Sequence, residues 1–511
     1  MSHNNFYITT PIYYPSGSPH IGHAYSSIIT DVFARFKRND NFNVYFLTGT
    51  DEHGLKIQKA AEANKMDPLF YCNKISKIFK DLSKLLNLSN DDFIRTTEER
   101  HYIAVKNIWE KLVSSEDIYL SKNKGWYSVS DEAYYNSDEI VEKNGKKISL
   151  FSGSSVEWVE EESFFFKLSA WEKKLLKFYD DNPKFILPLT RRNEVINFVK
   201  SGLKDLSISR TSFTWGIKVP NNEKHVIYVW LDALTNYLSA INYPNTNDNL
   251  YKKFWPATLH VIGKDILRFH AIYWPAFLLA ANIEPPKRIF SHGWILSGEE
   301  KMSKSKGNIL NPFDLIENYG VDQVRYYLMK EVSHGSDGNI SLKSLENCIN
   351  SDLANNYGNL CQRVFSFIKN NCNNLVKKTG DLSESDKKLE KQTKTLTQNL
   401  RSEMNDQNLN NYLKSVINIS FLTNKYINDE EPWKLKKNNA SKMNNILHTS
   451  LKQIAKISIL LNPVIPLSTT KVLNSLNITN DLINMSFLDE KEIFTDEIKI
   501  KHLDILFKKI I

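Results

Sequence analysis

The feature that most constrains the fold is an alternation of strand-like and helix-like segments near the N-terminus. Residues 6–14 are β-branched and aromatic and predict a buried strand, and residues 43–48 ("NVYFLT") predict a second. Residues 24–37 and 55–64 carry apolar side chains at helical spacing. Because strands that alternate with helices in this way are typical of βαβ units, we predict a parallel sheet.

The alternation stops after about residue 115, and residues 125–224 look like an inserted module of short strands and turns, rich in Ser, Glu, Lys and aromatic residues. Strand-like segments return in "VIYVWLDA" (226–233) and "ATLHVIGKDI" (257–266). We expect both to complete the first sheet. The predicted fold is therefore α/β, with a Rossmann-like parallel-sheet domain that is split by an insertion.

From about residue 346 onward the apolar residues recur at helical spacing, as in "NLCQRVFSFI" (359–368) and "YLKSVINISFL" (412–422). This pattern predicts an all-α helix bundle, with Ile511 inside its last helix. The predicted domains are 1–115 and 226–345 for the two halves of the α/β domain, 116–225 for the inserted module and 346–511 for the helical domain.

Composition narrows the class of function. The 511 residues carry a formal net charge of +8, a basic excess that permits a polyanionic partner without proving one. The four cysteines form no CxxC pair, so neither a disulfide framework nor a zinc signature is present. The N-terminus lacks a signal-peptide pattern, and the longest apolar run (271–281) has eleven residues and contains a proline. We expect a cytoplasmic protein without a membrane span.

The turn between the first strand and the first helix carries two histidines, in "PHIGHAY". His20, Gly22 and His23 lie where the N–H groups and the positive dipole end of a helix attract an anion. Taken alone, two histidines at this spacing are more often capping or packing residues, and zinc ligation is a further possibility.

A second cationic segment lies far downstream, in "EEKMSKSKGN" (299–308), which alone indicates a solvated surface loop. Lys301 and Lys304 could close over a triphosphate that the histidine turn holds. Attack of a carboxylate on the α-phosphate of ATP requires no general base, because the carboxylate is already ionised at pH 7. Such a site must stabilise charge instead, and glycine at position 22 lets ATP lie close to the backbone.

The two motifs, inside an interrupted βαβ sheet, resemble the signature of class I aminoacyl-tRNA synthetases. The chain also resembles the methionyl-tRNA synthetase family along nearly its whole length, for example in "FLTGTDEHGLKI", "YVWLDALTNY", "VIGKDILRFHAIYWPAF" and "NKYINDEEPW". The resemblance implies activation of methionine with ATP to methionyl-adenylate and pyrophosphate. It further implies transfer of methionine to the 3′ terminal adenosine of initiator and elongator tRNA(Met).

The resemblance also implies a methionine pocket, in which Asp51 pairs with the ammonium group. The unbranched, polarizable side chain of methionine calls for an apolar, aromatic-walled pocket. Core packing is the alternative for each aromatic residue, and a helix N-cap is the alternative for Asp51. The implied pocket residues are Pro11, Ile12, Tyr14, Asp51, Trp230, Ala233, Leu234, Tyr237, Ile266 and His270.

The same resemblance implies the ATP site. His20, His23, Lys301 and Lys304 are implied as catalytic residues. A surface charge is the alternative for Lys264, and a turn residue is the alternative for Asp265. Magnesium is expected to accompany ATP. The implied ATP-binding residues are His20, Gly22, His23, Lys264, Asp265, Gly293, Trp294, Ile295 and Lys304.

Three residues of the predicted helical domain are implied at the anticodon. Asn359 and Arg363 lie one helical turn apart, and Trp433 follows a proline at a predicted helix start. Aromatic stacking and Arg or Asn hydrogen bonds are the means by which proteins read unpaired RNA bases. Ordinary bundle packing is the alternative for Trp433. No appended OB-like domain of the kind that dimerises some relatives is seen, so we expect a monomer.

One segment departs from the family pattern. Many methionyl enzymes carry a CxxC zinc knuckle in the inserted module, but the matching place here reads Ser128-Val129-Ser130-Asp131. These residues lack the soft thiolates that zinc prefers, so we expect no structural zinc and no other metal site.

Other functions fit the sequence less well. Synthetases for isoleucine, valine and leucine insert a large editing domain, for which the module leaves no room. A catalytically retired RNA-binding relative would usually have lost one of the two signatures. A small-molecule nucleotidyltransferase would have no reason to keep a long helical bundle.

Overall fold

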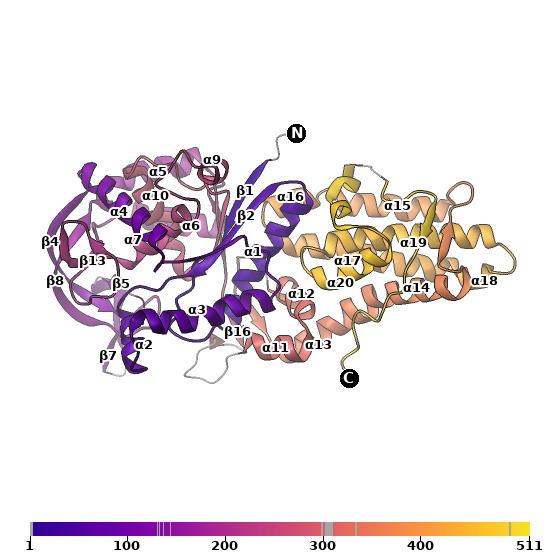
Figure 1. The fold of residues 1–511 in the computed structure, drawn as a ribbon, viewed down its shortest axis with the longest axis horizontal. Helices are drawn as coiled ribbons and strands as arrows, with labels where there is room; N and C mark the ends of the chain where they lie inside the picture. The colour runs from indigo at the N-terminus through magenta and orange to yellow at the C-terminus, as the bar shows by residue number, and fades with distance from the viewer. Residues whose placement is uncertain are drawn as a thin grey trace.

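The structure is a computed structural model that describes residues 4–129, 131, 133–135, 137–143, 145–297, 300–301, 310–332, 335–489 and 492–511. The molecule is elongated, with strands and helices mixed at one end and helices dominating the other (Figure 1). This division agrees with the predicted fold class, in which an α/β part precedes a helical part.

A six-stranded parallel sheet forms the centre of the α/β part. Its pairing of β1 with β14, in which Thr9 lies opposite His260, closes the sheet across the intervening chain. The expectation that residues 257–266 complete the first sheet is thus confirmed. In order across the sheet the strands are β3 (Asp92–Arg95), β2 (Asn43–Thr50), β1 (Asn5–Thr9), β14 (Leu259–Gly263), β15 (Ile289–His292) and β9 (Ile186–Leu187).

Helices connect these strands. Helix α1 (Ile21–Asn39) joins β1 to β2, and Ile28, Ile29 and Val32 on its inner face are fully buried. Helices α2 (Leu55–Ala63), α3 (Pro68–Leu85) and α4 (Glu99–Ser114) follow β2 and β3.

The second strand-like segment, residues 226–233, does not join this sheet, so that prediction is wrong. β13 (Asn222–Ile227) is antiparallel to β11 (Ser209–Arg210) and β12 (Lys218–Val219) in a separate sheet. The chain then turns directly into helix α7 (Val229–Leu234). In a short run of apolar residues, the spacing of these residues does not distinguish a strand from a buried helix, which explains the wrong prediction.

The chain between β3 and β14 contains a second, antiparallel sheet built on the long pair β4 (Ile118–Ser128) and β8 (Glu157–Phe166). This pair lies at the far end of the α/β part in Figure 1. The remaining elements of this region are β5 (Ala133–Tyr135), β6 (Ile140–Lys143), β7 (Lys146–Ser149), α5 (Glu172–Asp181), α6 (Leu189–Lys200) and β10 (Leu206–Ser207).

The other end of the molecule is a bundle of helices. The two longest, α17 (Leu409–Glu430) and α19 (Ala440–Leu461), lie side by side at its centre (Figure 1). The other helices of this region include α13 (Leu342–Cys348), α14 (Asn359–Asn371), α15 (Glu384–Thr397), α18 (Pro432–Leu435) and α20 (Pro466–Ser475).

The C-terminal segment differs from the prediction, because the residues after 500 are not helical. Strand β20 (Glu497–Lys499) ends just before this segment and pairs with β19 (Leu375–Lys377). Ile500, Leu503 and Phe507 are buried against the bundle. Their spacing is that of one face of a helix, although the segment that carries them is not helical, so the pattern was misleading.

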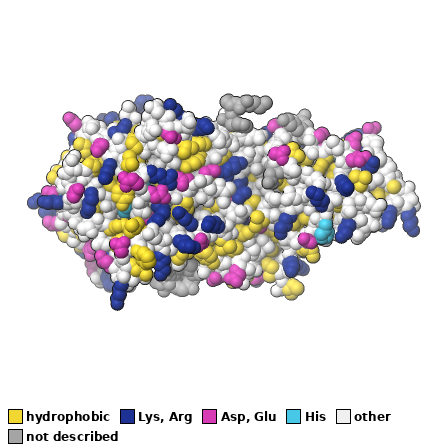
Figure 2. All heavy atoms as spheres, viewed as in Figure 1, with side chains coloured by type: hydrophobic (Ala, Val, Ile, Leu, Met, Phe, Trp, Pro, Cys, Tyr) yellow, Lys and Arg dark blue, Asp and Glu magenta, His cyan; other side chains and the backbone are white. Residues whose placement is uncertain are grey.

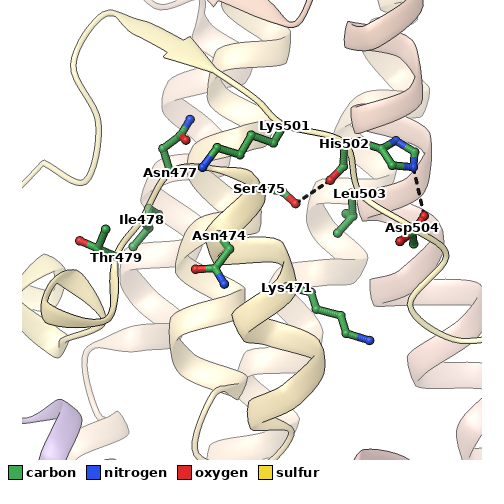
Figure 3. Close-up of a pocket in the computed structure, with 10 residues that line it drawn as sticks. All are labelled: Lys471, Asn474, Ser475, Asn477, Ile478, Thr479, Lys501, His502, Leu503 and Asp504. Carbon is green, nitrogen blue, oxygen red and sulfur yellow. Dashed lines mark hydrogen bonds and ion pairs between the residues drawn. The ribbon is translucent and has the colours of Figure 1, made fainter.

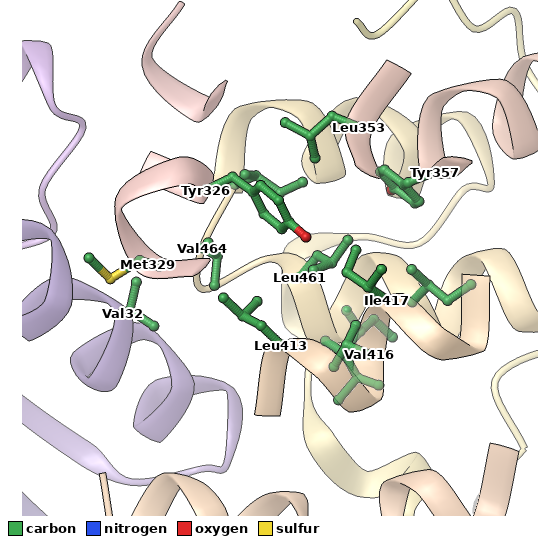
Figure 4. Close-up of a cluster of buried hydrophobic side chains, with 14 of the residues drawn as sticks. Val32, Tyr326, Met329, Leu353, Tyr357, Leu413, Val416, Ile417, Leu461 and Val464 are labelled. Carbon is green, nitrogen blue, oxygen red and sulfur yellow. The ribbon is translucent and has the colours of Figure 1, made fainter. Parts of the chain in front are cut away.

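The α/β part and the bundle share one packed core. Val32 of α1 and Met329 of α12 (Val321–Glu331) lie in the same apolar cluster as Leu413 and Val464 of the bundle (Figure 4). Among the described residues, no helix is both long and apolar enough to cross a membrane.

A buried ion pair of the α/β part, Arg325 with Asp31, also contacts the bundle across this junction. The Arg325 guanidinium donates to the Asp31 carboxylate of α1 (2.7 Å) and to the backbone oxygens of Val464 (2.8 Å) and Leu86 (3.0 Å). Burial raises the pKa of Asp31, but Arg35 and Arg325 outweigh it and hold that pKa below its ordinary value. The Arg325 guanidinium therefore joins α1, through Asp31, to the bundle, through Val464.

Candidate functional site

The two histidines sit at the start of α1, and each uses one ring nitrogen to cap the helix. Gly22 N–H donates to His20 Nδ1 (3.1 Å), and His20 N–H donates to His23 Nδ1 (3.0 Å). Since both Nδ1 atoms accept, each neutral ring carries its hydrogen on Nε2. The rings stack with centroids 3.8 Å apart, so two N–H donors lie together at the positive end of the helix dipole.

Gly22 has a local role in this turn. A Cβ at position 22 would lie 2.9 Å from His20 Cε1 and 3.1 Å from His20 Nδ1. The glycine therefore lets the His20 ring fold over the first helical turn, in addition to the close nucleotide approach that the sequence suggested.

The end of β14 and the end of β15 form a second cluster. Lys264 Nζ donates to Asp337 (2.7 Å) and lies 4.0 Å from the centre of the Trp294 ring. Trp294 donates through Nε1 to Asp265 (3.2 Å) and through its backbone N–H to Asp337 (2.9 Å). A Cβ at Gly293 would lie 2.0 Å from the Ser336 carbonyl oxygen, so only glycine fits there.

This second cluster is tied to the histidine turn. Ser26 of α1 and His292 of β15 are hydrogen-bonded through Oγ and Nε2 at 2.8 Å. Burial lowers the pKa of His292, so the ring is neutral at pH 7. The sequence did not lead us to predict Ser26, His292 and Asp337 as part of this site. They lie outside the two signatures, and predicting their contacts would have required knowledge of the strand order.

Asp51 lies directly after β2, beside the segment that follows β1. Its backbone N–H donates to the Tyr13 carbonyl (2.9 Å), and its side chain is largely buried. The Tyr14 hydroxyl donates to the His53 carbonyl (2.5 Å). Pro11, Ile12, Tyr14 and Asp51 are thus held close together by the pairing of these two segments.

Trp230 and Tyr237 pack in the same apolar cluster as Ile12 and Tyr14. The Trp230 ring stacks on Phe269 with centroids 3.7 Å apart and planes within 5°. His270 donates from Nδ1 to the Ile266 carbonyl (3.0 Å), so its Nε2 accepts from the Tyr237 hydroxyl (2.8 Å). Burial lowers the pKa of His270 to about 4, which makes the ring neutral at pH 7.

Ala233 and Leu234 are buried on α7, between Trp230 and the short helix α8 (Asn236–Ser239) that carries Tyr237. Tyr237 also stacks on His260 of β14, with centroids 4.0 Å apart. The structure therefore brings the Trp230 to Tyr237 segment and the Ile266 to His270 segment into one aromatic cluster.

The downstream lysines are only partly described. The backbone of Lys301 lies in β17 (Glu300–Lys301), where it pairs with Leu296 of β16 (Ile295–Ser297), next to Ile295. Lys304 lies outside the described residues. The start of the second signature is thus placed beside the Gly293–Ile295 segment.

At the tip of the helical part, Arg363 and Trp433 face each other. The Arg363 guanidinium carbon lies 5.9 Å from the centre of the Trp433 ring, and Nη1 donates to Asn428 (2.7 Å). Trp433 is 42% exposed, which argues against plain core packing. Asn359 is exposed one turn before Arg363 on α14. On the face shown in Figure 2, basic and acidic side chains are interspersed, so charge alone does not mark an RNA path there.

Hydrogen bonds connect the residues at the place where many members of the family carry a zinc knuckle. The Asp131 carboxylate accepts from the hydroxyls of Tyr135 (2.9 Å), Ser152 (2.5 Å) and Ser154 (3.0 Å). The Ser128 hydroxyl oxygen accepts from Asp131 N–H (3.2 Å), and Ser130 lies outside the described residues. In the described part of the chain, no three His, Cys, Asp or Glu side chains are grouped to hold a metal.

A surface hollow of about 620 Å³ lies elsewhere, between the end of α20 and the C-terminal segment (Figure 3). Ser475 donates to the His502 carbonyl (3.0 Å), and the His502 ring contacts Asp504 (3.0 Å) on the same C-terminal segment. Its lining includes none of the predicted site residues.

Sequence reasoning also missed two buried polar clusters beside Asp51. Glu52 accepts from Arg95 at 2.7 and 2.9 Å, and burial, which raises the Glu52 pKa, is outweighed by Arg95 and neighbouring hydroxyls, which lower it. Asp232 accepts from both His53 and His101 at 2.7 Å. The runs of polar residues in "GTDEHG" and "TEERH" are the sequence feature that could have indicated these clusters.

Comparison with known proteins first defines the class. A family model described as "tRNA synthetases class I (M)" matches residues 6–147 and 144–365. A second, described as "Anticodon binding domain of methionyl tRNA ligase", matches residues 376–511. The parallel sheet with a histidine turn after its first strand fits the class that the first model describes.

Similar sequences and solved structures indicate a more specific family within this class. A Methionine--tRNA ligase of Brucella suis is 49% identical over 482 residues, covering 94% of this chain and 93% of its own length. One from Rickettsia felis is 51% identical over 486 residues, covering 94% and 93%. The Mycobacterium tuberculosis methionyl-tRNA synthetase bound by methionyl-adenylate has a TM-score of 0.96 at 42% identity, covering 99% of this chain and 100% of that one. The chain therefore belongs to the methionyl-tRNA synthetase family.

Proposed function

We propose that this protein activates methionine with ATP at the carboxyl edge of its six-stranded sheet and then transfers it to tRNA(Met). One observation carries the proposal. The segments that follow β1, β2, β14 and β15 hold the histidine turn, Asp51, the Lys264 to His270 segment and Gly293 to Ile295, respectively. Because these four strands are adjacent and parallel, all four segments meet at one edge, where open parallel sheets bind ligands.

In the first step, an oxygen of the methionine carboxylate attacks the α-phosphorus of ATP, and pyrophosphate leaves. The Nε2–H groups of His20 and His23 are placed to stabilise the charge that develops on phosphate oxygens. Lys301 and Lys304 supply further positive charge, and Mg²⁺ arrives with the ATP phosphates as part of the substrate. The cluster of Lys264, Asp265, Gly293, Trp294 and Ile295 holds the adenosine part.

In the second step, a hydroxyl of the terminal tRNA adenosine attacks the methionyl carbonyl, and AMP leaves. The amino acid is held by its ammonium group at Asp51. Its side chain lies among Trp230, Tyr237 and His270, a largely apolar cluster that accommodates a flexible thioether. The neutral state of His270 keeps a charge out of this pocket, which favours methionine over polar amino acids.

At the other end, Asn359, Arg363 and Trp433 bind the anticodon that initiator and elongator tRNA(Met) share. The exposed Trp433 ring with a guanidinium beside it suits stacking of an unpaired base. We further propose that the enzyme acts as a monomer in the cytoplasm. The proposed division is a catalytic domain (1–115 and 226–345), a connective module (116–225) and an anticodon-binding domain (346–511).

The connective module works without zinc in this proposal. Asp131 already accepts hydrogen bonds from three hydroxyls and so holds the turn that cysteine thiolates and zinc hold in other members. Elemental analysis of the purified protein should find less than 0.1 zinc per chain, roughly the level of adventitious metal. A stoichiometric content that survives chelation would contradict this part.

The decisive experiment is exchange of labelled pyrophosphate into ATP, which should require methionine and not proceed with isoleucine or leucine. His23→Ala should slow exchange by roughly a hundredfold with little change in the KM for methionine, because these donors act mainly in the transition state. His23→Gln is the matched variant, since a glutamine at this helix position can accept the His20 N–H and still donate. It should recover part of the rate. Exchange with another amino acid alone would refute the proposed specificity.

A further inference from the structure

Three buried side chains form a hydrogen-bonded chain beside the proposed methionine pocket. The Asp232 carboxylate accepts from His53 Nδ1–H and from His101 Nε2–H, each at 2.7 Å. Asp232 and His101 are fully buried, and His53 is 1% exposed. The outer nitrogens are used as well, because the Tyr102 hydroxyl lies 3.1 Å from His53 Nε2 and the Ser239 hydroxyl 2.7 Å from His101 Nδ1.

The three residues come from three separate elements. His53 lies two residues after Asp51, in the segment that follows β2, and His101 lies near the start of α4. Asp232 lies on α7 between Trp230 and Ala233. The chain of hydrogen bonds therefore joins the side of the pocket that holds the methionine ammonium group to the side that holds its thioether.

The carboxylate in the middle fixes the geometry. Burial raises the pKa of Asp232, but His53 and His101 outweigh it and bring that pKa to about 2, so the group is ionised at pH 7. A carboxylate only accepts hydrogen bonds, so the two nitrogens that face it both carry hydrogens. A buried carboxylate that loses one of these donors must move toward another donor or toward water.

Apolar side chains of similar size would fill this space at a lower cost, since buried charge is expensive to desolvate. The two short, directional hydrogen bonds from His53 and His101 to Asp232 do what apolar packing cannot, because they set the distance and the angle between the elements they connect. The segment after β2 that carries His53 is also held by Trp215, whose indole N–H donates to the Glu52 carbonyl (2.6 Å).

We propose that His53, Asp232 and His101 are positioning residues that set the spacing between Asp51 and Trp230, and so determine how well methionine is bound. The inference rests on the proposed function, which places methionine between those two residues. None of the three touches the substrate. Their effect is on the amino acid and not on the nucleotide, because the ATP cluster around Lys264, Trp294 and Asp337 is held by its own hydrogen bonds.

Matched substitutions at two positions test this role. His53→Asn keeps an N–H donor near Nδ1, whereas His53→Leu has a similar volume and no donor. His101→Gln and His101→Leu form the corresponding pair for Nε2. Each leucine variant should raise the KM for methionine about tenfold, the effect of losing roughly one hydrogen bond to a charged group, with the KM for ATP changed less than twofold. The asparagine and glutamine variants should stay within about threefold of wild type.

His448→Leu is the control for loss of a buried imidazole. His448 lies on α19 in the helical part, is 3% exposed and contacts the Thr495 carbonyl at 3.0 Å. Its substitution should lower the melting temperature and leave both KM values unchanged. If a leucine variant does not fold, Asp232→Asn decides, since its amide can accept from only one histidine and should produce the same rise in the methionine KM.

Two results would overturn the inference. One is a leucine variant with the same methionine KM as its asparagine or glutamine partner, and the other is a proportional rise in both KM values. Failure of the proposed function would look different, because the wild-type protein itself would then show no methionine-dependent exchange, and the inference would fall with it.

Discussion

The exposed Trp433 at the tip of the helical part allows the anticodon assignment to be tested separately from catalysis. Trp433→Ala removes an indole that is 42% exposed and lies beside the Arg363 guanidinium. The ring contributes little to the core, so the variant should fold normally. Its expected effect is confined to the step that involves tRNA.

The magnitude follows from what the ring can contribute. Stacking of one base on an aromatic side chain contributes about 1 to 3 kcal/mol. The Arg363 guanidinium carbon lies 5.9 Å from the ring centre, at the outer limit of a cation–π contact, so this contact adds little to the stacking free energy. Since about 1.4 kcal/mol corresponds to a factor of ten, kcat/KM for tRNA aminoacylation should fall roughly 5- to 150-fold.

The assay compares two rates in the same preparation. Aminoacylation of tRNA(Met) reports the anticodon contact, and methionine-dependent pyrophosphate exchange without tRNA reports only the distant active site. Trp158→Ala is the matched control, since Trp158 is another tryptophan, 51% exposed, on β8 of the inserted module. It should leave kcat/KM for tRNA within about threefold of wild type, well short of a stacking loss.

Two outcomes would refute this reasoning. An unchanged aminoacylation rate in Trp433→Ala would show that no base stacks on the ring. Equal losses of aminoacylation and exchange would show that the substitution damages the fold, which circular dichroism and the melting temperature would reveal directly.

Three further predictions concern the active site. Tyr237→Phe leaves His270 Nε2 without its 2.8 Å donor, and about 1 to 3 kcal/mol should appear as a 5- to 150-fold higher methionine KM in exchange assays. Gly293→Ala places a Cβ 2.0 Å from the Ser336 carbonyl oxygen, so the ATP KM should rise at least roughly tenfold while calorimetry shows unchanged methionine binding. Because the folded-state pKa of Asp232, about 2, lies below its ordinary value of 3.8, about 2 kcal/mol of stability is present above pH 4 and is lost as the pH falls from 4 to 2. Urea unfolding of wild type and Asp232→Asn across that range should show a loss about 2 kcal/mol larger in wild type, because the other carboxylates with lowered pKa values, such as Asp31, contribute to both proteins.

The sequence predicted a strand or a helix correctly where the spacing of apolar residues and the residue types indicate the same element. The first strand and the helix after His20 follow from residue type and spacing, although the strand ends at Thr9 and does not continue to Tyr14 as predicted. The capping role of the histidines was one of the alternatives that the sequence left open. The structure shows that the capping role and the donor role are compatible, because capping uses Nδ1 and leaves the hydrogen on Nε2. The two interpretations of this turn were therefore not exclusive.

Errors arose where a local pattern has two solutions that only tertiary context separates. Residues 226–233 are apolar enough for a central strand, yet they divide between an antiparallel strand and α7. Residues 500–507 have helical spacing, yet they bury Ile500, Leu503 and Phe507 in a non-helical segment. In both cases, neighbouring elements that are distant in sequence determine the outcome.

The sequence also does not reveal which residues pair through buried polar contacts, and the reason here is different. Asp232 and His101 are separated by 131 positions, and nothing in either segment indicates that they meet. The same holds for Arg325 and Asp31, separated by 294 positions. A buried charge needs a partner, so each such residue predicts that a partner exists, but its identity depends on the strand order and the helix packing.

The buried Arg325 shows why the two distant ends of this molecule form one mechanical unit. Its guanidinium is anchored to α1 through Asp31 and to the bundle through the Val464 carbonyl, and loss of either contact would leave an unsatisfied buried group. A displacement of the bundle relative to α1 is therefore opposed by hydrogen bonds as well as by apolar packing. Because His20 caps the start of α1, any movement of the bundle that is large enough to strain this contact must also act on the helix that carries the two histidines.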